Sequence, residues 1–310
     1  MATLAKQPVE SNSKSSSHIY HADAQVLSGQ LEQPVNEAIP VQAQVVLPET
    51  GMLQYAAAIP EQLPQQLRGI ISFRSGYSQV AGHQSAKAAH GFTTVATSAI
   101  EGLNVLDVLT ADRVVGQITT HHPPYPEEGQ VPSVAFLGTR FDNLRIGGHE
   151  VKVERHLDII GPKPDRDKSY FDDRGVLSRI SDQYAKINKT KGLPIWASQQ
   201  FRWRKPALQA QNGKQISTMQ CSVIKSVTGG PGLSFGHVID LPHFGKIFLG
   251  ELTVTRELGK PAKAKSDDAT PDKYVFHLTM IRLELGCIAQ GSTTIVTADA
   301  NGTGSGTGHH

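Results

Sequence analysis

The chain has 310 residues with 29 glycines, 18 prolines and a hydrophobic content of 38%. This composition favours many short strands and turns over long helices, and the length suits one large β domain. Thirty basic and 28 acidic residues leave a formal charge of only +2. No strong overall field is therefore expected to draw the chain onto nucleic acid or an anionic membrane.

The N-terminal part divides into two regions. Residues 1–17 are polar and rich in serine, which predicts a disordered N-terminus because such a stretch buries too little apolar surface to order itself. Residues 18–68 contain β-like runs interrupted by Pro34, Pro40 and Pro48, and prolines confine strands to sheet edges. We therefore expect an extended N-terminal arm with edge strands over 18–68. A main β domain over 69–300 and a flexible tail over 301–310 follow it.

The start of the chain has no apolar run of signal-peptide length, and no window reaches the roughly 18 apolar residues of a spanning helix. We therefore predict no membrane span and a cytoplasmic location. Export by a route without a signal peptide, or association with the cell surface, is the alternative.

The centre of the chain, residues 93–148, contains three β-rich runs. Threonine and valine dominate the first two runs, and these residues favour strands. Residues 103–109 fit either a corner between strands or one or two helical turns. The pair Gly147-Gly148 predicts a hairpin turn after the third run.

One helix is predicted, over residues 176–187. Its apolar side chains recur on one face, and Asp173 is placed to cap its N-terminus. The later runs are again β-like, including WASQQFRW, in which Phe201 and Trp203 would share the inner side of an edge strand. We therefore predict an all-β fold: an antiparallel sandwich or flattened barrel with one amphipathic helix inserted.

The densest set of potential metal ligands is His121, His122, Glu127 and Glu128, in a proline-rich loop. Imidazole and carboxylate groups suit zinc or another divalent ion. Adjacent histidines point in different directions on an extended backbone, so both could bind one ion only in a distorted loop. A rigid surface loop without a metal is the simpler interpretation.

A second candidate site is the hairpin that begins at His237 and ends at His243, with Asp240 between them. These groups could converge with an acid, or the histidines could be satisfied within the fold. Glu251 lies in the apolar run KIFLGELTV and needs a partner, and Arg282 or Arg256 on a neighbouring strand is expected to supply it.

The two cysteines, Cys221 and Cys287, each lie in an apolar run. Small buried thiols are the commonest interpretation of such positions, and a disulfide between them is the alternative if their strands are adjacent. The sequence carries no phosphate-binding glycine loop, dinucleotide fingerprint, Gly-x-Ser-x-Gly or His-Glu-x-x-His motif, which argues against an enzyme. No cofactor is expected, with a divalent metal as the alternative.

Several segments share a pattern of strands and corners: VATSAIEGLNVLDVLTADRVVGQITT, FLGTRFDNLRIGGHEV, IDLPHFGKIFLGELTV, FHLTMIRLELG and IVTADANG. In these segments the chain resembles uncharacterised bacterial β-rich proteins similar to the choice-of-anchor P family. The resemblance implies an all-β fold without an established activity, and no functional residue carries over from it. The surface-anchored members have a signal peptide or anchor that is not visible here.

We therefore expect a non-catalytic structural or interaction protein that forms homo-oligomers through edge strands or the N-terminal arm. Nucleic acid is not an expected partner. The alternative is an enzyme, or a β protein that binds a small ligand or metal, with its site in the 121–128 loop or the 237–243 hairpin.

Overall fold

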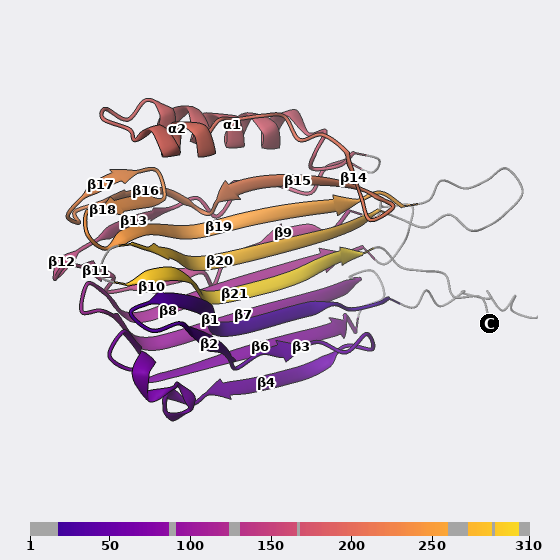
Figure 1. Cartoon of the computed structure of the whole chain (residues 1–310). Coiled ribbons are helices and arrows are strands. Elements are labelled where there is room, and N and C mark those ends of the chain that lie inside the picture. The colour runs from indigo at the N-terminus through magenta and orange to yellow at the C-terminus, as the bar shows by residue number, and fades with distance from the viewer. Residues whose placement is uncertain are drawn as a thin grey trace, which may run out of the picture.

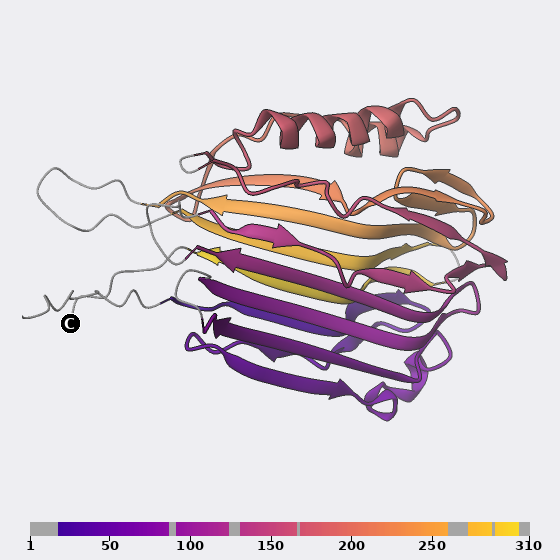
Figure 2. The ribbon, with the colours of Figure 1, turned by 180° about the vertical axis from the view of Figure 1, so that it is seen from behind.

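The computed structural model describes residues 18–86, 91–123, 131–165, 168–259, 272–286 and 289–303. Two large antiparallel sheets stack face to face, and two helices lie along one edge of the stack (Figures 1 and 2). Neither sheet closes on itself. The fold is therefore an all-β sandwich and not a barrel. Residues 1–17, expected to be disordered, and the tail from residue 304 lie outside the described residues.

The larger sheet has ten strands and faces the viewer in Figure 1. Its main path runs in the order β14 (Gln209–Gln211), β15 (Lys214–Ser222), β19 (Gly245–Glu257), β20 (Lys273–Leu285), β21 (Gln290–Thr303), β1 (Ala22–Gln33), β2 (Glu37–Gln42). Three short strands attach to this path: β3 (Val45–Val46), β17 (Leu233–Phe235) and β18 (Val238–Leu241).

The second sheet has nine strands and faces the viewer in Figure 2. Its main path is β12 (His149–Glu150), β11 (Arg145–Ile146), β8 (Leu109–His122), β7 (Phe92–Val105), β6 (Ser75–Gln84), β4 (Met52–Ala58). Three short strands, β5 (Ile71–Ser72), β9 (Ser133–Ala135) and β10 (Arg140–Asp142), pair beside it, and a separate ribbon joins β13 (Lys152–Arg155) to β16 (Ile224–Thr228).

The segment 18–68, expected to be an extended arm, contributes strands to both sheets. Its strand β1 lies inside the larger sheet between β21 and β2. Pro40 lies in β2, which forms an edge, as prolines in strands usually do. The segment's strand β4 belongs to the second sheet, and the 3₁₀ turns Pro60–Gln62 and Gln65–Leu67 connect β4 to β5 within that sheet.

The predicted helix is confirmed as α1 (Arg174–Asn188), and the Asp173 side chain caps it by accepting the Val176 N–H at 2.9 Å. The run WASQQFRW is not a strand, because its first residues lie in a second helix, α2 (Ile195–Gln200). Trp196 and Phe201 pack on Phe235 with the larger sheet behind. This packing overrides the alternation that favoured a strand.

The two predicted turns in the centre of the chain are tight hairpins. Leu106 and Asp107, both with φ of +54°, connect β7 to β8, which excludes a helical turn at 103–109. Gly147 and Gly148, at φ of +55° and +79°, connect β11 to β12. Two successive left-handed residues are typical of hairpin turns that match the twist of the strands.

The larger sheet has a crease, where four neighbouring strands each turn two consecutive residues towards the core. The pairs are Val26–Leu27 in β1, Leu249–Gly250 in β19, Met280–Ile281 in β20 and Ile295–Val296 in β21, and in the last three strands each pair lies within a run of four buried residues. The pairing of β19 with β20 keeps one register across it, from Leu249↔Ile281 to Glu251↔Thr279. Neighbouring strands therefore exchange their inner and outer faces together.

Backbone strain marks the crease. Gly250 has φ of +60° and Val296 has φ of +57°. Glycine tolerates this left-handed region, but for a β-branched residue it is a genuine outlier that only the surrounding packing can maintain.

The second sheet meets the crease with small residues. Ser98 and Gly116 lie opposite each other on β7 and β8. A Cβ on Gly116 would lie 2.9 Å from Met280 Cγ and 3.0 Å from Val296 Cγ1. Ser98 Oγ also donates a hydrogen bond of 2.8 Å to the carbonyl of Gln25 in the larger sheet. The two sheets therefore approach closely along this line.

The substitution Gly116→Val should lower the free energy of unfolding by about 1–3 kcal/mol, because the added side chain overpacks the contact with Met280 and Val296. The matched control is Gly69→Val, where a Cβ would meet no atom within 4 Å. Denaturant unfolding of both variants measures the difference, and equal losses would contradict a close approach at Gly116.

Candidate functional site

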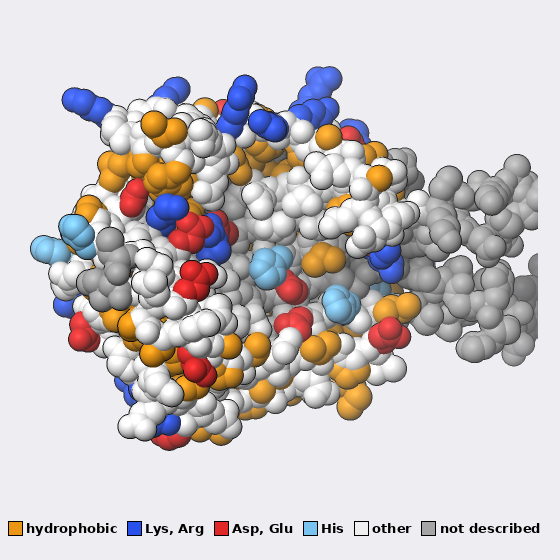
Figure 3. All heavy atoms as spheres, viewed as in Figure 1, with side chains coloured by type: hydrophobic (Ala, Val, Ile, Leu, Met, Phe, Trp, Pro, Cys, Tyr) orange, Lys and Arg blue, Asp and Glu red, His pale blue; other side chains and the backbone are white. Residues whose placement is uncertain are grey.

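A groove opens on the outer face of the larger sheet, beneath α1 and α2. It encloses about 290 Å³, and its walls include Tyr184, Gln220, His237, Glu251, His277 and Arg282. Figure 3 shows this face with histidine, acidic and basic side chains gathered below the helices.

The crease explains why the groove is there. Between Glu251 and Phe248 of β19, and between Thr279 and Arg282 of β20, the two intervening residues leave the outer face. On the outer face, a line of positions from which no side chain projects therefore runs across the neighbouring strands. The groove lies over this line, with Glu251, Thr279 and Arg282 beside it.

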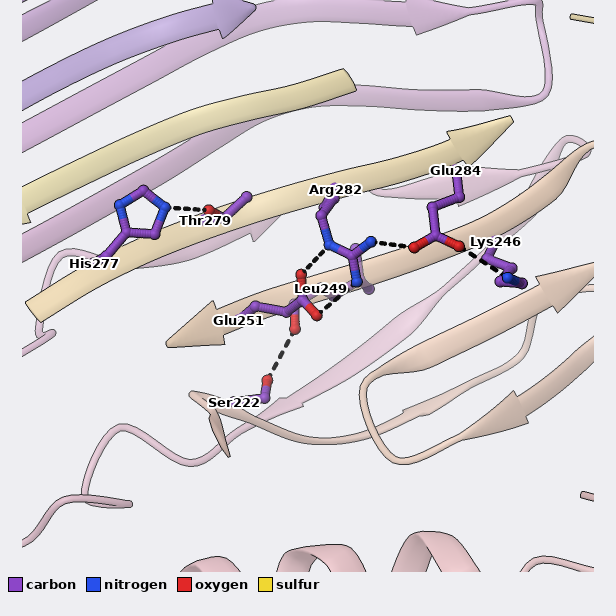
Figure 4. A network of polar contacts seen from close by, with 8 residues as sticks. All are labelled: Ser222, Lys246, Leu249, Glu251, His277, Thr279, Arg282 and Glu284. Atoms are coloured by element: carbon purple, nitrogen blue, oxygen red, sulfur yellow. Dashed lines mark hydrogen bonds and ion pairs between the residues drawn. The ribbon is translucent and has the colours of Figure 1, made fainter. Parts of the chain in front are cut away.

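An ion-pair network follows one side of the groove (Figure 4). Arg282 donates to both carboxylate oxygens of Glu251, at 2.6 and 2.9 Å, which confirms the predicted pairing of Glu251 with Arg282. Arg282 also donates to Glu284, which accepts a second bond of 2.8 Å from Lys246. Bidentate contacts of this kind are among the strongest polar contacts in proteins.

The charges in this network balance, with two acids and two bases. Burial alone would raise the pKa of Glu284, but the hydrogen bonds from Lys246 and Arg282 lower it below its ordinary value. The Arg282 guanidinium also lies 3.7 Å above the Phe248 ring. The network is therefore fully paired and offers no free charge to a ligand.

A histidine network lies further along β20 and β21. His277 Nδ1 donates to the Asp299 carboxylate, and His277 Nε2 lies 3.0 Å from Thr279 Oγ1 (Figure 4 shows the latter). Burial would lower the pKa of His277, but the Asp299 hydrogen bond and nearby carboxylates raise it above its ordinary value. This arrangement holds the imidazole in one orientation at the groove wall.

His237 lies at the inner end of the groove. It is only 3% exposed, and its Nδ1 atom has no hydrogen-bond partner within the described residues. Burial lowers the pKa of His237 to about 4, so the ring is neutral at pH 7. An unsatisfied buried nitrogen beside a cavity is a polar contact that a ligand or water would complete.

The 237–243 hairpin does not bring its polar groups together. His243 lies on the surface in a turn with φ of +66°. Asp240 accepts a hydrogen bond of 3.2 Å from Trp196 Nε1. His237 alone reaches the groove.

The predicted metal loop is only partly described. His121 and His122 are consecutive on β8, so their side chains lie on opposite faces. His121 Nδ1 lies 3.2 Å from Thr93 Oγ1, whereas His122 is buried. Glu127 and Glu128 lie outside the described residues. In the described ranges, no three His, Cys, Asp or Glu side chains are grouped so that they could hold a metal ion.

His122 belongs to a buried aromatic cluster at one end of the sandwich. The His18 ring stacks on Phe92 at 4.6 Å and lies 4.7 Å from the rings of His122 and Tyr20. Neither nitrogen of His18 has a hydrogen-bond partner in the described part of the chain. Burial lowers the pKa of His18 to about 4.

Cys221 is a buried free thiol on β15, and burial raises its pKa. This agrees with the interpretation of a small buried side chain. Cys287 lies outside the described residues, and because Cys221 is free, the alternative of a disulfide between the two is not borne out.

A separate apolar surface follows β4, at the edge of the second sheet away from the helices (Figure 1). Met52, Leu53 and Tyr55 are 67%, 61% and 60% exposed. The strand pairs with β6 on one side only. Its sequence MLQYAAA contains neither a charge nor a proline.

Comparison with known protein families gives one match. A family model described as a domain of unknown function, DUF8256, matches residues 18–255. The chain belongs to the DUF8256 family. The matched residues run from the first strand of the sandwich into β19 and include both helices. No curated protein and no solved structure gives a match. Across the described part of this family member, no helix combines the length and apolar character needed to cross a bilayer.

The substitution His18→Phe should flatten the dependence of stability on pH. The pKa of His18 is lower in the folded chain than its ordinary value of 6.5, so between pH 4 and 6.5 the unfolded state binds more protons. The stability that neutral His18 contributes is therefore complete above pH 6.5 and is lost as pH falls towards 4.

Phenylalanine can keep the stack on Phe92 without a nitrogen to protonate. The free energy of unfolding falls in the parent when the pH is lowered from 7 to 4.5. In the variant we expect this fall to be smaller by on the order of 2–3 kcal/mol. The control is His149→Phe at an exposed position. Unchanged pH dependence in His18→Phe would contradict a buried neutral His18.

Proposed function

We propose that this DUF8256 protein is a non-catalytic interaction protein that self-associates by pairing its β4 edge with the β4 edge of a second copy. The observation that carries the proposal is the exposed, uncharged and proline-free strand Met52–Ala58. Proteins usually protect such edges, because unpaired N–H and C=O groups form a template for another strand.

The other described edges are protected. β2 contains Glu37 and Pro40, β14 has three residues, and β12 has two. Short strands, charges and prolines all discourage edge pairing. Only β4, among the edge strands of the described ranges, combines length with a lack of these features.

The sequence of β4 is suited to pairing with the same strand of a second copy of the chain. An antiparallel pair of identical strands centred on Tyr55 would place Leu53 opposite Ala57 and Gln54 opposite Ala56. Tyr55 already stacks on Tyr77 with ring centroids 6.0 Å apart, so two such pairs would extend one aromatic surface. The small net charge of +2 opposes association only weakly.

Light scattering after size exclusion tests the proposal. The parent chain should form a species of twice 33.5 kDa, and Tyr55→Lys should be monomeric because a charge on the edge blocks strand pairing. The control is Leu137→Lys, since Leu137 is 80% exposed but lies away from β4. A parent chain that stays monomeric at high concentration, or a dimer that survives Tyr55→Lys, would contradict the proposal.

A second candidate function is the binding of a small neutral, polar molecule in the groove. The charges at Glu251, Arg282 and Glu284 are satisfied by one another or by Lys246. The side chains of Gln220, Thr253 and His237 line the groove, and within the described residues His237 Nδ1 has no hydrogen-bond partner. Amide, hydroxyl and neutral imidazole groups suit a ligand that carries hydroxyls but no charge.

Saturation-transfer NMR with glucose and N-acetylglucosamine, and with charged glucuronate and glucosamine for comparison, tests this candidate. We expect signals from the neutral sugars only, and Thr253→Val with Gln220→Ala should remove them. Gln209→Ala on β14 is the control. An absence of signal from both neutral sugars, or equal signals from the charged ones, would contradict a neutral-ligand site.

A further inference from the structure

The net charge of +2 conceals a strongly uneven distribution. Residues 174–205, which contain both helices, hold eight basic residues and one acidic residue, so this segment alone carries +7. The rest of the chain holds 22 basic and 27 acidic residues and sums to −5. We call the segment 174–205 the helical cap.

The positive charge of the helical cap faces solvent. Seven of its basic residues are exposed: Arg174, Lys186, Lys189, Lys191, Arg202, Arg204 and Lys205. None of the ion pairs formed within the described part of the chain involves any of the seven. Figure 3 shows Lys and Arg side chains projecting from the outer side of the helices. Two of the seven, Arg174 and Lys186, lie on α1, about 18 Å apart along its axis at about 1.5 Å per residue.

An apolar tip lies among these charges, where α1 and α2 are joined. Ile195 is 77% exposed, directly after Leu193-Pro194 and close in sequence to Lys189 and Lys191. Trp196 is different, because its Nε1 donates to Asp240 and Lys246 covers its ring at 4.2 Å. Ile195 is therefore the large apolar side chain of the cap that the fold leaves uncovered.

We propose that the helical cap docks on an anionic lipid surface, with the exposed bases against the headgroups and Ile195 at the level of the interface. A row of cations that surrounds an apolar side chain is typical of proteins that bind the membrane surface. The rest of the chain is negatively charged and is repelled by the anionic surface, whereas the cap is attracted to it. The protein is therefore oriented with its cap towards the lipid.

A nucleic acid is the other polyanion to consider, and the cap fits it less well. A phosphate backbone offers no apolar contact for Ile195. Single strands are usually held by stacking on exposed aromatic rings, but Trp203 packs on Tyr184 at 5.6 Å and is half-buried. The positive charge of the cap would suit either polyanion, but the exposed Ile195 side chain suits only the bilayer.

Sedimentation with vesicles tests the docking surface on the full chain. Vesicles of phosphatidylcholine with about one third phosphatidylserine should bind the parent protein at low salt, and vesicles of phosphatidylcholine alone should not. Reversal of two cap charges, Lys189→Glu with Lys191→Glu, should weaken binding at least about tenfold. Lys152→Glu with Lys273→Glu, two exposed positions on the body, changes the net charge equally and should have a much smaller effect.

Ile195→Ser separates a bilayer from other polyanions. It should weaken binding to the anionic vesicles several-fold and leave any binding to a DNA duplex unchanged. Three results would overturn the proposal: no binding to anionic vesicles at low salt, equal losses in the two double variants, or binding to duplex DNA without binding to vesicles.

Discussion

The contact between the crease of the larger sheet and the small residues of the second sheet is the constraint on which the rest of the structure depends. Met280 and Val296 pack directly against Gly116. Val26 packs against Gly76 in the same way, since a Cβ on Gly76 would lie 2.9 Å from Val26 Cγ1. Protein interiors are close-packed, so the one extra inward residue that the crease gives each strand requires space on the facing sheet. Glycine and serine supply that space. The left-handed φ of Val296 is maintained because its side chain and both neighbouring strands are fixed by this contact.

The same crease determines what the outer face can do. Residues that turn inward leave a hollow, and the outward residues beside it, Glu251 and Arg282, become half-buried ionic groups that need each other. Removal of one partner from such a pair leaves an uncompensated charge, which is why these pairs are strongly coupled. Sheet packing alone therefore accounts for the groove, whether or not a ligand binds there.

The two surfaces proposed for interaction lie elsewhere, at opposite edges of the sandwich, with the helical cap above β15 and the free strand β4 below (Figure 1). In the proposed β4-paired dimer, the two caps would lie at its far ends.

Much of the fold could be predicted from local patterns in the sequence, but the site could not. Asp173 with the apolar period of 176–187 is sufficient to predict α1, the Gly147-Gly148 pair predicts its hairpin, and the isolated carboxylate of Glu251 predicts an arginine partner. The sequence pattern does not predict the six-residue helix α2, because Phe201 and Trp203 also fit strand alternation and contacts with Phe235 decide between the two. The crease has a weak signal in consecutive apolar residues such as Met280-Ile281 within alternating strands. The sequence points to His237 and to the Glu251–Arg282 pair separately, but not to the groove, because these residues and His277 come together only through sheet pairing. The net charge of the whole chain does not indicate the basic cap, because acidic residues elsewhere cancel its charge in the total.

The central functional claim is that β4 pairs with a second copy of the chain, and amide hydrogen exchange tests it at the strand itself. In the proposed dimer the outward N–H groups of Met52–Ala58 become hydrogen-bonded, whereas those of the edge strand Gln209–Gln211 stay as they are. Exchange in peptides that cover β4 should therefore slow as the protein concentration rises, while exchange in β14 does not change. Exchange in β4 that is equally fast in dilute and concentrated protein would contradict the claim.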